Sequence, residues 1–134
     1  MKKLKMQVSG ENEGIKSIVK AGRHELIVDE GSQVGGNDEG PNPLQYMLIA
    51  LAGCENVVAH AVAKEMAFDL QGLTFDISGE FDPRGFMGDP NVRTYFETVT
   101  INVKREDNGI RRTFARTSRK SRGAVSCIRH LFCR

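Results

Sequence analysis

Cys54 is the residue in this sequence whose type and setting could most directly support chemistry. It lies in the apolar stretch Ala50-Leu-Ala-Gly-Cys-Glu-Asn56. A nucleophilic cysteine needs a thiol pKa below its ordinary value of about 8.5, usually because of a nearby Arg, Lys or His. A buried structural thiol is the alternative interpretation, because free cysteine is among the most buried residue types. The adjacent Gly53 favours a place of close approach, because glycine within a helix costs about 1 kcal/mol relative to alanine.

The histidines give Cys54 no catalytic partner. His60 follows Cys54 by six residues, which places it on roughly the opposite side of a helix, so it cannot be the base for Cys54 in the same subunit. His24 and His130 have no metal-like spacing to a cysteine. The usual serine-hydrolase and zinc-protease motifs are missing. We therefore expect no metal and no cofactor, and a cation for Cys54 that comes from another element.

Length and composition predict a soluble protein with a single domain over residues 1–134. The 134 residues are 40% hydrophobic and 27% charged, which is typical of one globular domain. No apolar run reaches the roughly 18 to 20 residues that span a bilayer, and the basic start has no apolar stretch behind it. Three cysteines, at positions 54, 127 and 133, do not suit a secreted disulfide framework. We expect a cytoplasmic protein without a membrane segment.

A long helix over residues 43–66 must position Cys54. Asn42 is a suitable N-cap and Pro43 suits the first helical position. Apolar side chains occupy nearly every face of this helix, whereas a surface helix needs only one apolar stripe. A chain of this length can hardly cover all those faces, so the pattern predicts a second subunit.

Strand-like runs flank the helix on both sides, with glycine-rich and proline-rich loops at residues 31–40 and 82–91. Because strands and helices do not alternate regularly, the order favours an α+β fold with antiparallel sheet. The runs cover residues 3–8, 15–19, 24–29, 70–81 and 93–104.

The last segment, residues 108–134, differs from the rest of the chain. It contains eight Lys and Arg and no acidic residue. A basic tail can bind nucleic acid, but this one has no recognised nucleic-acid motif and no apolar periodicity, so we expect no nucleic-acid partner. The abrupt change of charge and the lost periodicity instead suggest a reading-frame shift after about residue 107.

The run Gly40-Pro-Asn-Pro-Leu-Gln-Tyr-Met-Leu-Ile-Ala-Leu-Ala-Gly-Cys54 resembles the OsmC/Ohr family of osmotically inducible and organic hydroperoxide resistance proteins. The glycine-rich loop before it and the loop Phe81-Asp-Pro-Arg-Gly-Phe-Met-Gly-Asp-Pro-Asn-Val-Arg93 are also similar to members of this family. The resemblance extends from about residue 14 to residue 105. It implies an OsmC-like intertwined homodimer in which antiparallel sheets wrap around long central helices.

The resemblance also implies a thiol peroxidase at the subunit interface. Cys54 would be the peroxidatic thiolate that attacks an organic hydroperoxide, and Cys127 would resolve the sulfenic acid as a disulfide. A dithiol reductant of lipoyl type would then restore the enzyme. An arginine from the N-terminal strands would hold the thiolate, and Arg23 suits this role better than Lys16 or Lys20 because its guanidinium is fixed.

Three departures from the family pattern keep an alternative open. The turn in which the family's hydroperoxidases place a glutamate has Leu44 and Gln45 here, and the register of Arg23 is not fixed by the sequence. The tail lacks the family's second amphipathic helix, so Cys127 and Cys133 are either resolving thiols or incidental ones. The alternative is a non-catalytic dimer of the same fold that binds an apolar small molecule at its interface.

Overall fold

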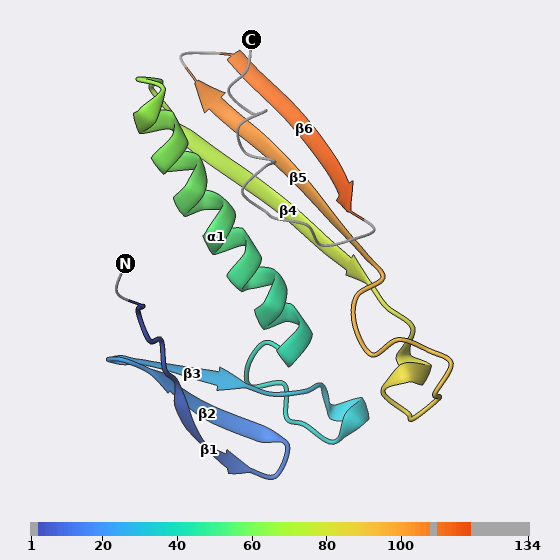
Figure 1. Ribbon diagram of the computed structural model, residues 1–134. Coiled ribbons are helices and arrows are strands. Elements are labelled where there is room, and N and C mark those ends of the chain that lie inside the picture. Colours follow the sequence, from blue (N-terminus) through green and yellow to red (C-terminus); the bar gives the residue numbers. More distant parts are fainter. Residues whose placement is uncertain (1–2, 108–109, 119–134) are drawn as a thin grey trace. The chain divides into compact units, whose positions relative to one another are not determined.

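The computed structural model describes residues 3–107 and 110–118, which form two antiparallel sheets and one long helix (Figure 1). The predicted α+β class with antiparallel sheets is therefore confirmed. The chain divides into two compact units, residues 1–49 and residues 50–134, and each is described by itself. The elements are β1 (Ser9–Glu13), β2 (Lys16–Ala21), β3 (His24–Val28), η1 (Ser32–Val34), α1 (Pro43–Glu65), β4 (Gly72–Glu80), η2 (Pro83–Gly85), β5 (Thr98–Asp107) and β6 (Ile110–Ser118).

The first unit contains a meander of two tight hairpins, β1–β2 and β2–β3. Each hairpin turns through two residues, and the first of them is a glycine with positive φ, +63° at Gly14 and +62° at Gly22. Left-handed φ values are what two-residue hairpin turns require, and glycine adopts them without steric cost. The predicted meander is thus confirmed, although the strand predicted over residues 3–8 is wrong, because the first paired strand begins at Ser9.

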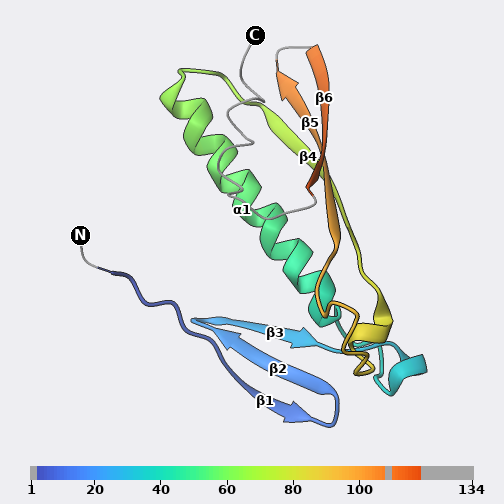
Figure 2. The same cartoon turned by 45° about the vertical axis from the view of Figure 1, so that its right-hand side comes forward.

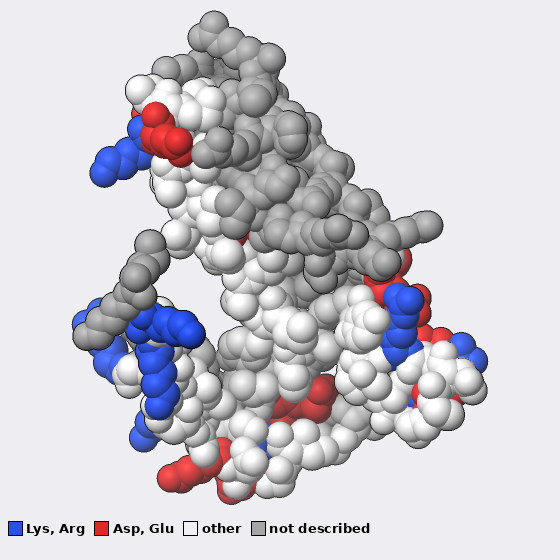
Figure 3. All heavy atoms as spheres, in the orientation of Figure 1, with Lys and Arg blue, Asp and Glu red and all other residues white. Residues whose placement is uncertain are grey.

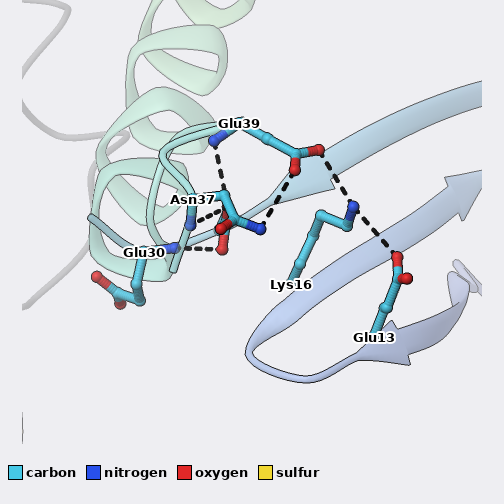
Figure 4. Close-up of polar contacts among 6 residues, drawn as sticks. Glu13, Lys16, Glu30, Asn37 and Glu39 are labelled. Atoms are coloured by element: carbon cyan, nitrogen blue, oxygen red, sulfur yellow. Dashed lines mark hydrogen bonds and ion pairs between the residues drawn. The ribbon is translucent and has the colours of Figure 1, made fainter. Parts of the chain in front are cut away.

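The buried carboxylate of Asp29 organises the glycine-rich loop after β3 (Figure 4). Asp29 is 1% exposed, and its two oxygens accept hydrogen bonds from the backbone N–H groups of Glu30, Asn37 and Glu39 at 2.9, 3.0 and 3.2 Å. These bonds hold the pKa of Asp29 below its ordinary value of 3.8. Gly36 is required here, because a Cβ at this position would lie 1.9 Å from the carbonyl oxygen of Glu30.

A reciprocal capping box starts α1, as the Asn-Pro pair predicted. The side chain of Asn42 accepts a hydrogen bond from the backbone N–H of Gln45 at 2.8 Å, and the Gln45 side chain accepts one from the N–H of Asn42 at 2.9 Å. The Tyr46 hydroxyl donates to the carbonyl oxygen of Ile27 at 2.7 Å and so ties the first helical turn to β3. The helix has 23 residues, from Pro43 to Glu65, and a length of about 35 Å.

In the second unit, α1 lies along one face of the sheet β4–β5–β6, as the two views in Figures 1 and 2 both show. The strands pair in the order β4–β5–β6, with nine paired positions in each ladder. The core between helix and sheet is small. Its buried hydrophobic residues are Ala59, Val62, Ala63 and Val103, and the partly buried residues packed against them are Val58, Phe68, Leu70, Leu73, Phe75 and Ile101.

The second sheet differs from the sequence prediction at two places. The strand predicted over residues 93–104 begins later, at Thr98, because the loop after β4 extends to Glu97, whose N–H donates to the carbonyl oxygen of Glu80 at 2.8 Å. Part of the basic tail, Ile110–Ser118, forms β6 and pairs with β5 along its length. The single-domain organisation and the frame shift stay predictions.

The helix α1 is long and apolar enough to cross a membrane by length and composition alone. One such helix is weak evidence for a membrane span, since core helices of soluble proteins meet the same criterion. Only 22% of its most apolar 18-residue window is buried in this single chain. The expected absence of a membrane segment stays a prediction, and the exposed apolar surface of α1 needs a cover.

We expect Asp29→Asn to destabilise the protein at pH 7, because the amide carries no charge and places its own N–H donors among three backbone donors. The folded-state pKa of Asp29 is lowered, so its stabilising effect is full above about pH 3.8 and is lost as the pH falls through the lower, folded-state value. Thermal unfolding of both proteins from pH 7 to pH 2.5 measures this difference. A gap in Tm that stays constant over this range would contradict the role assigned to the charge.

Candidate functional site

Cys54 lies in the middle of α1 on a side that faces away from the sheet. The helix residues that pack toward the sheet are Glu55, Ala59, Val62 and Ala63, whereas Cys54 is exposed. Within the described chain the thiol forms no disulfide and has no hydrogen-bond partner. The interpretation of Cys54 as a buried structural thiol is therefore wrong for the single chain.

Small and apolar residues surround Cys54 on this outward side. Ala50, Cys54, Val57 and Ala61 follow one another at spacings of four, three and four residues, and all are exposed. This spacing is that of a helix–helix packing seam, in which residues alternate every three and four positions. Beside the seam, a Cβ placed on Gly53 would meet no atom within 4 Å. No part of this chain accounts for the glycine, so the close approach that it suggests must come from another molecule.

Two buried charged residues lie in the same unit as Cys54. Glu55, next to Cys54, is 4% exposed and points toward the sheet. Arg105 on β5 is 5% exposed, and its guanidinium lies over the ring of Phe68, 4.6 Å from the ring centroid. Such a contact combines packing with a cation–π attraction. The burial of Glu55 fixes the rotation of α1 that turns Cys54 outward.

His60 has a local role on the helix surface. Its Nδ1 lies 3.0 Å from the carbonyl oxygen of Asn56, one turn earlier in α1, and the residue is exposed. This contact agrees with the interpretation of His60 as a satisfied histidine.

Arg23 occupies the second position of the β2–β3 turn, between Gly22 and His24, and is exposed. Figure 3 shows basic side chains gathered around this turn and the segment that precedes β1. The exposed basic residues of this region are Lys3, Lys5, Lys20 and Arg23. Arg23 belongs to the first unit and Cys54 to the second, and the pairing of the two stays a prediction.

The other positions raised by the sequence have definite outcomes. Gln45, which lies in the turn where a glutamate was expected, uses its side chain to cap the helix. Lys16 bonds to Glu39 at 3.1 Å and to Glu13 at 3.2 Å, which raises its pKa and makes it unsuitable as the cation for a thiolate. Cys127 and Cys133 lie outside the described residues. Among the described residues, no group of three or more His, Cys, Asp or Glu is arranged to hold a metal ion.

The loop between β4 and β5 presents aromatic side chains on a firmly held backbone. The Asp82 carboxylate accepts hydrogen bonds from the backbone and the guanidinium of Arg84, which lower the pKa of Asp82. Phe81 makes edge-to-face contacts with Phe86 and Phe96, with ring centroids 5.6 and 6.0 Å apart. The loop also carries the exposed residues Met87 and Tyr95.

Sequence reasoning missed Asp29, Glu55, Arg105 and this aromatic cluster. Asp29 had a usable signal, because an Asp between a strand and a glycine-rich segment often bonds to the backbone of the following turn. Glu55 and Arg105 carried no such signal, since a lone charge within a patterned element is usually on the surface.

Comparison with known proteins places this arrangement in a family. A family model described as "OsmC-like protein" matches residues 35–127, a segment that contains α1, Cys54 and Cys127 but not Arg23. No curated protein matches the chain. The chain belongs to the OsmC-like protein family.

Two solved structures have a similar fold. One is a "putative osmotic stress induced and detoxification response protein" from Psychrobacter arcticus 273-4, with 16% identity, a TM-score of 0.62, and coverage of 80% of this chain and 74% of that one. The other, from Legionella pneumophila, is described as an organic hydroperoxide resistance protein OsmC, predicted redox protein and regulator of sulfide bond formation. It is 15% identical with a TM-score of 0.50, and the match covers 75% of this chain and 66% of that one. Identities this low show the fold alone.

Proposed function

We propose that this protein is a thiol peroxidase that reduces organic hydroperoxides and acts as a homodimer. The observation that carries the proposal is the placement of Cys54, an exposed cysteine in the centre of an apolar helix of the OsmC-like family. A thiolate at this position can accept a peroxide from outside the chain, whereas a cysteine that packed toward the sheet could not. The neighbour described as an organic hydroperoxide resistance protein supports this choice of substrate.

The proposed reaction has three balanced steps. The Cys54 thiolate attacks one oxygen of the hydroperoxide, the O–O bond breaks, and the alkoxide takes a proton and leaves as the alcohol. Cys54 is thereby oxidised to a sulfenic acid, and the Cys127 thiol displaces its oxygen as water and forms a disulfide. A dithiol reductant of lipoyl type reduces this disulfide and becomes a cyclic disulfide itself. No cofactor or metal takes part.

The second subunit follows from the exposed apolar surface of α1. Val57 on the outward seam is 68% exposed, and the seam residues around it are small or apolar. Small side chains allow two helices to pack closely, and burial of apolar area gains about 25 cal/mol per Å². The same seam of a second copy is the cover that we propose, and it would also exclude water from around Cys54. Because a soluble dimer of this kind needs no membrane, the cytoplasm remains the compartment that we expect.

One observation favours a second candidate function, the binding of an apolar small molecule without turnover. The loop after β4 holds Phe86, Met87 and Tyr95 at the surface, and the helix turn carries Gln45 where the family's hydroperoxidases have a glutamate. On this alternative, an apolar ligand binds and Cys54 is not consumed by peroxide.

We expect Cys54→Ser to lower peroxidase turnover at least about a thousandfold, because a hydroxyl does not replace a thiolate as the nucleophile. The assay follows consumption of a dihydrolipoyl donor with cumene hydroperoxide. Cys127→Ser should stop turnover after one equivalent and leave a sulfenic acid on Cys54 that dimedone traps, whereas the matched variant Cys133→Ser should keep full activity. A wild-type protein whose thiols survive a stoichiometric dose of hydroperoxide would refute the peroxidase and leave the binding function.

We expect Arg23→Ala to lower kcat/KM by about 100-fold at pH 7, because loss of a cation beside the thiolate reduces its population and its stabilisation. The matched control is Lys20→Ala, which removes a positive charge from the same hairpin. The pH profile of Cys54 alkylation should move to higher pH in the Arg23 variant only. Equal effects of both substitutions would assign the result to the general charge of the hairpin and not to Arg23.

The dimer is tested on the seam itself. Val57→Asp should weaken association about 100-fold or more, because each subunit loses a buried apolar contact and gains a buried charge. Asn56→Asp adds the same charge one residue earlier, off the seam, and should leave association unchanged. Sedimentation equilibrium measures both, and a wild-type protein that stays monomeric at high concentration would contradict the dimer.

A further inference from the structure

Residues 3–8 have the pattern of a β-strand but no partner strand in the described chain. They read Lys-Leu-Lys-Met-Gln-Val, with apolar and polar residues in strict alternation. Pairing with β2 begins only at Ser9, and Figure 2 shows the segment leading into β1 from beyond the ends of the paired strands. Leu4, Met6 and Val8 are 86%, 89% and 65% exposed. One face of this segment is thus apolar and uncovered, and its backbone groups lack a ladder.

β4 offers an open edge with the complementary pattern. Among the described strands it pairs only with β5, so its other edge is unpaired along nine residues. Its side chains alternate between a partly buried apolar face toward α1, with Leu73, Phe75 and Ile77, and an exposed polar face. That polar face consists of Thr74, Asp76, Ser78 and Glu80. Long edges without proline or a bulge readily accept a further strand.

Charge selects this edge over the others. β4 carries Asp76 and Glu80 and no basic residue, whereas residues 3–8 carry Lys3 and Lys5 and no acid. The sequence of β6 contains three arginines and no acid, which repels a basic strand. The edge of β3 is partly occupied, because the carbonyl oxygen of Ile27 accepts the Tyr46 hydroxyl and lies against Gly40.

We infer that residues 3–8 add a strand to the open edge of β4 in a second copy of this chain. Six extended residues span about 20 Å, which fits within the nine residues of β4. In any register that keeps the polar faces together, Lys3 and Lys5 lie on the same side as Asp76 and Glu80, and the apolar residues extend the face that packs on α1. The inference rests on the dimer proposed above and assigns it a second contact, separate from the helix seam.

Charge reversal tests the contact without altering a buried residue. One variant combines Lys3→Glu with Lys5→Glu, and the other combines Asp76→Lys with Glu80→Lys. Each alone should weaken dimerisation about tenfold or more at low salt, because like charges then face each other at two symmetric contacts. An equimolar mixture should form heterodimers with close to wild-type affinity, because both contacts again pair opposite charges. Native mass spectrometry and sedimentation equilibrium measure the species.

Matched controls place the same charge changes elsewhere. Lys20→Glu and Asp69→Lys change exposed residues outside both surfaces and should leave the dimer intact. In the wild-type dimer, the amides of residues 4–8 should exchange with deuterium more slowly than in the Val57→Asp monomer. Far-ultraviolet circular dichroism of each variant should match the wild type, which shows that its fold is retained.

The outcomes separate this inference from the proposals on which it rests. Reversed variants that dimerise as tightly as the wild type, or a mixture that forms no heterodimer, would overturn the added strand while the seam dimer stands. Weakened stability in both variants without rescue on mixing would place the pairing within one chain and also overturn it. Peroxidase turnover through Cys54 is measured separately, so its loss or presence leaves this test unaffected.

Discussion

The structure depends on a mismatch between the apolar surface of α1 and the surface that one chain can offer to cover it. The sheet β4–β5–β6 covers one side of the helix through a core of small residues, with Ala59, Val62 and Ala63 facing Val103. Val57 and Met66 stay exposed on the same helix. Soluble monomers rarely leave such continuous apolar surface open, and large exposed patches usually mark interaction sites. Association therefore follows from the same residues that make the helix apolar all round.

Polar contacts take over where the hydrophobic core is absent. In the described part of the first unit the one fully buried side chain belongs to Asp29, and its carboxylate binds three backbone N–H groups of the glycine-rich loop. A buried carboxylate is stable only when such donors satisfy it. This arrangement fixes the loop that ends at the cap of α1, so the start of the helix that carries Cys54 depends on an ionised group and not on packed side chains.

Local chemistry explains which features the sequence could predict. The Asn42–Pro43 cap, the length of α1 and the glycine turns of the hairpins depend on neighbouring residues, and all three were predicted correctly. Strand positions depend on distant partners, so residues 3–8 looked like a strand and pair with none in the described chain, and β5 begins only at Thr98. The burial of Glu55 and Arg105 depends on the packing of α1 against the sheet. Neither periodicity nor composition contains that information.

Stability and reactivity are coupled through the outward seam of α1. Cys54 lies within the stripe whose apolar neighbours need a cover, and the burial of Glu55 prevents the helix from turning this stripe toward its own sheet. A partner that covers the stripe would remove water from around the thiol, which disfavours the thiolate unless a cation accompanies it. The described part of the second unit places no such cation beside Cys54. The group that activates the sulfur must then arrive with another part of the assembly, so the surface that stabilises the dimer and the charge that makes it reactive have to be supplied together.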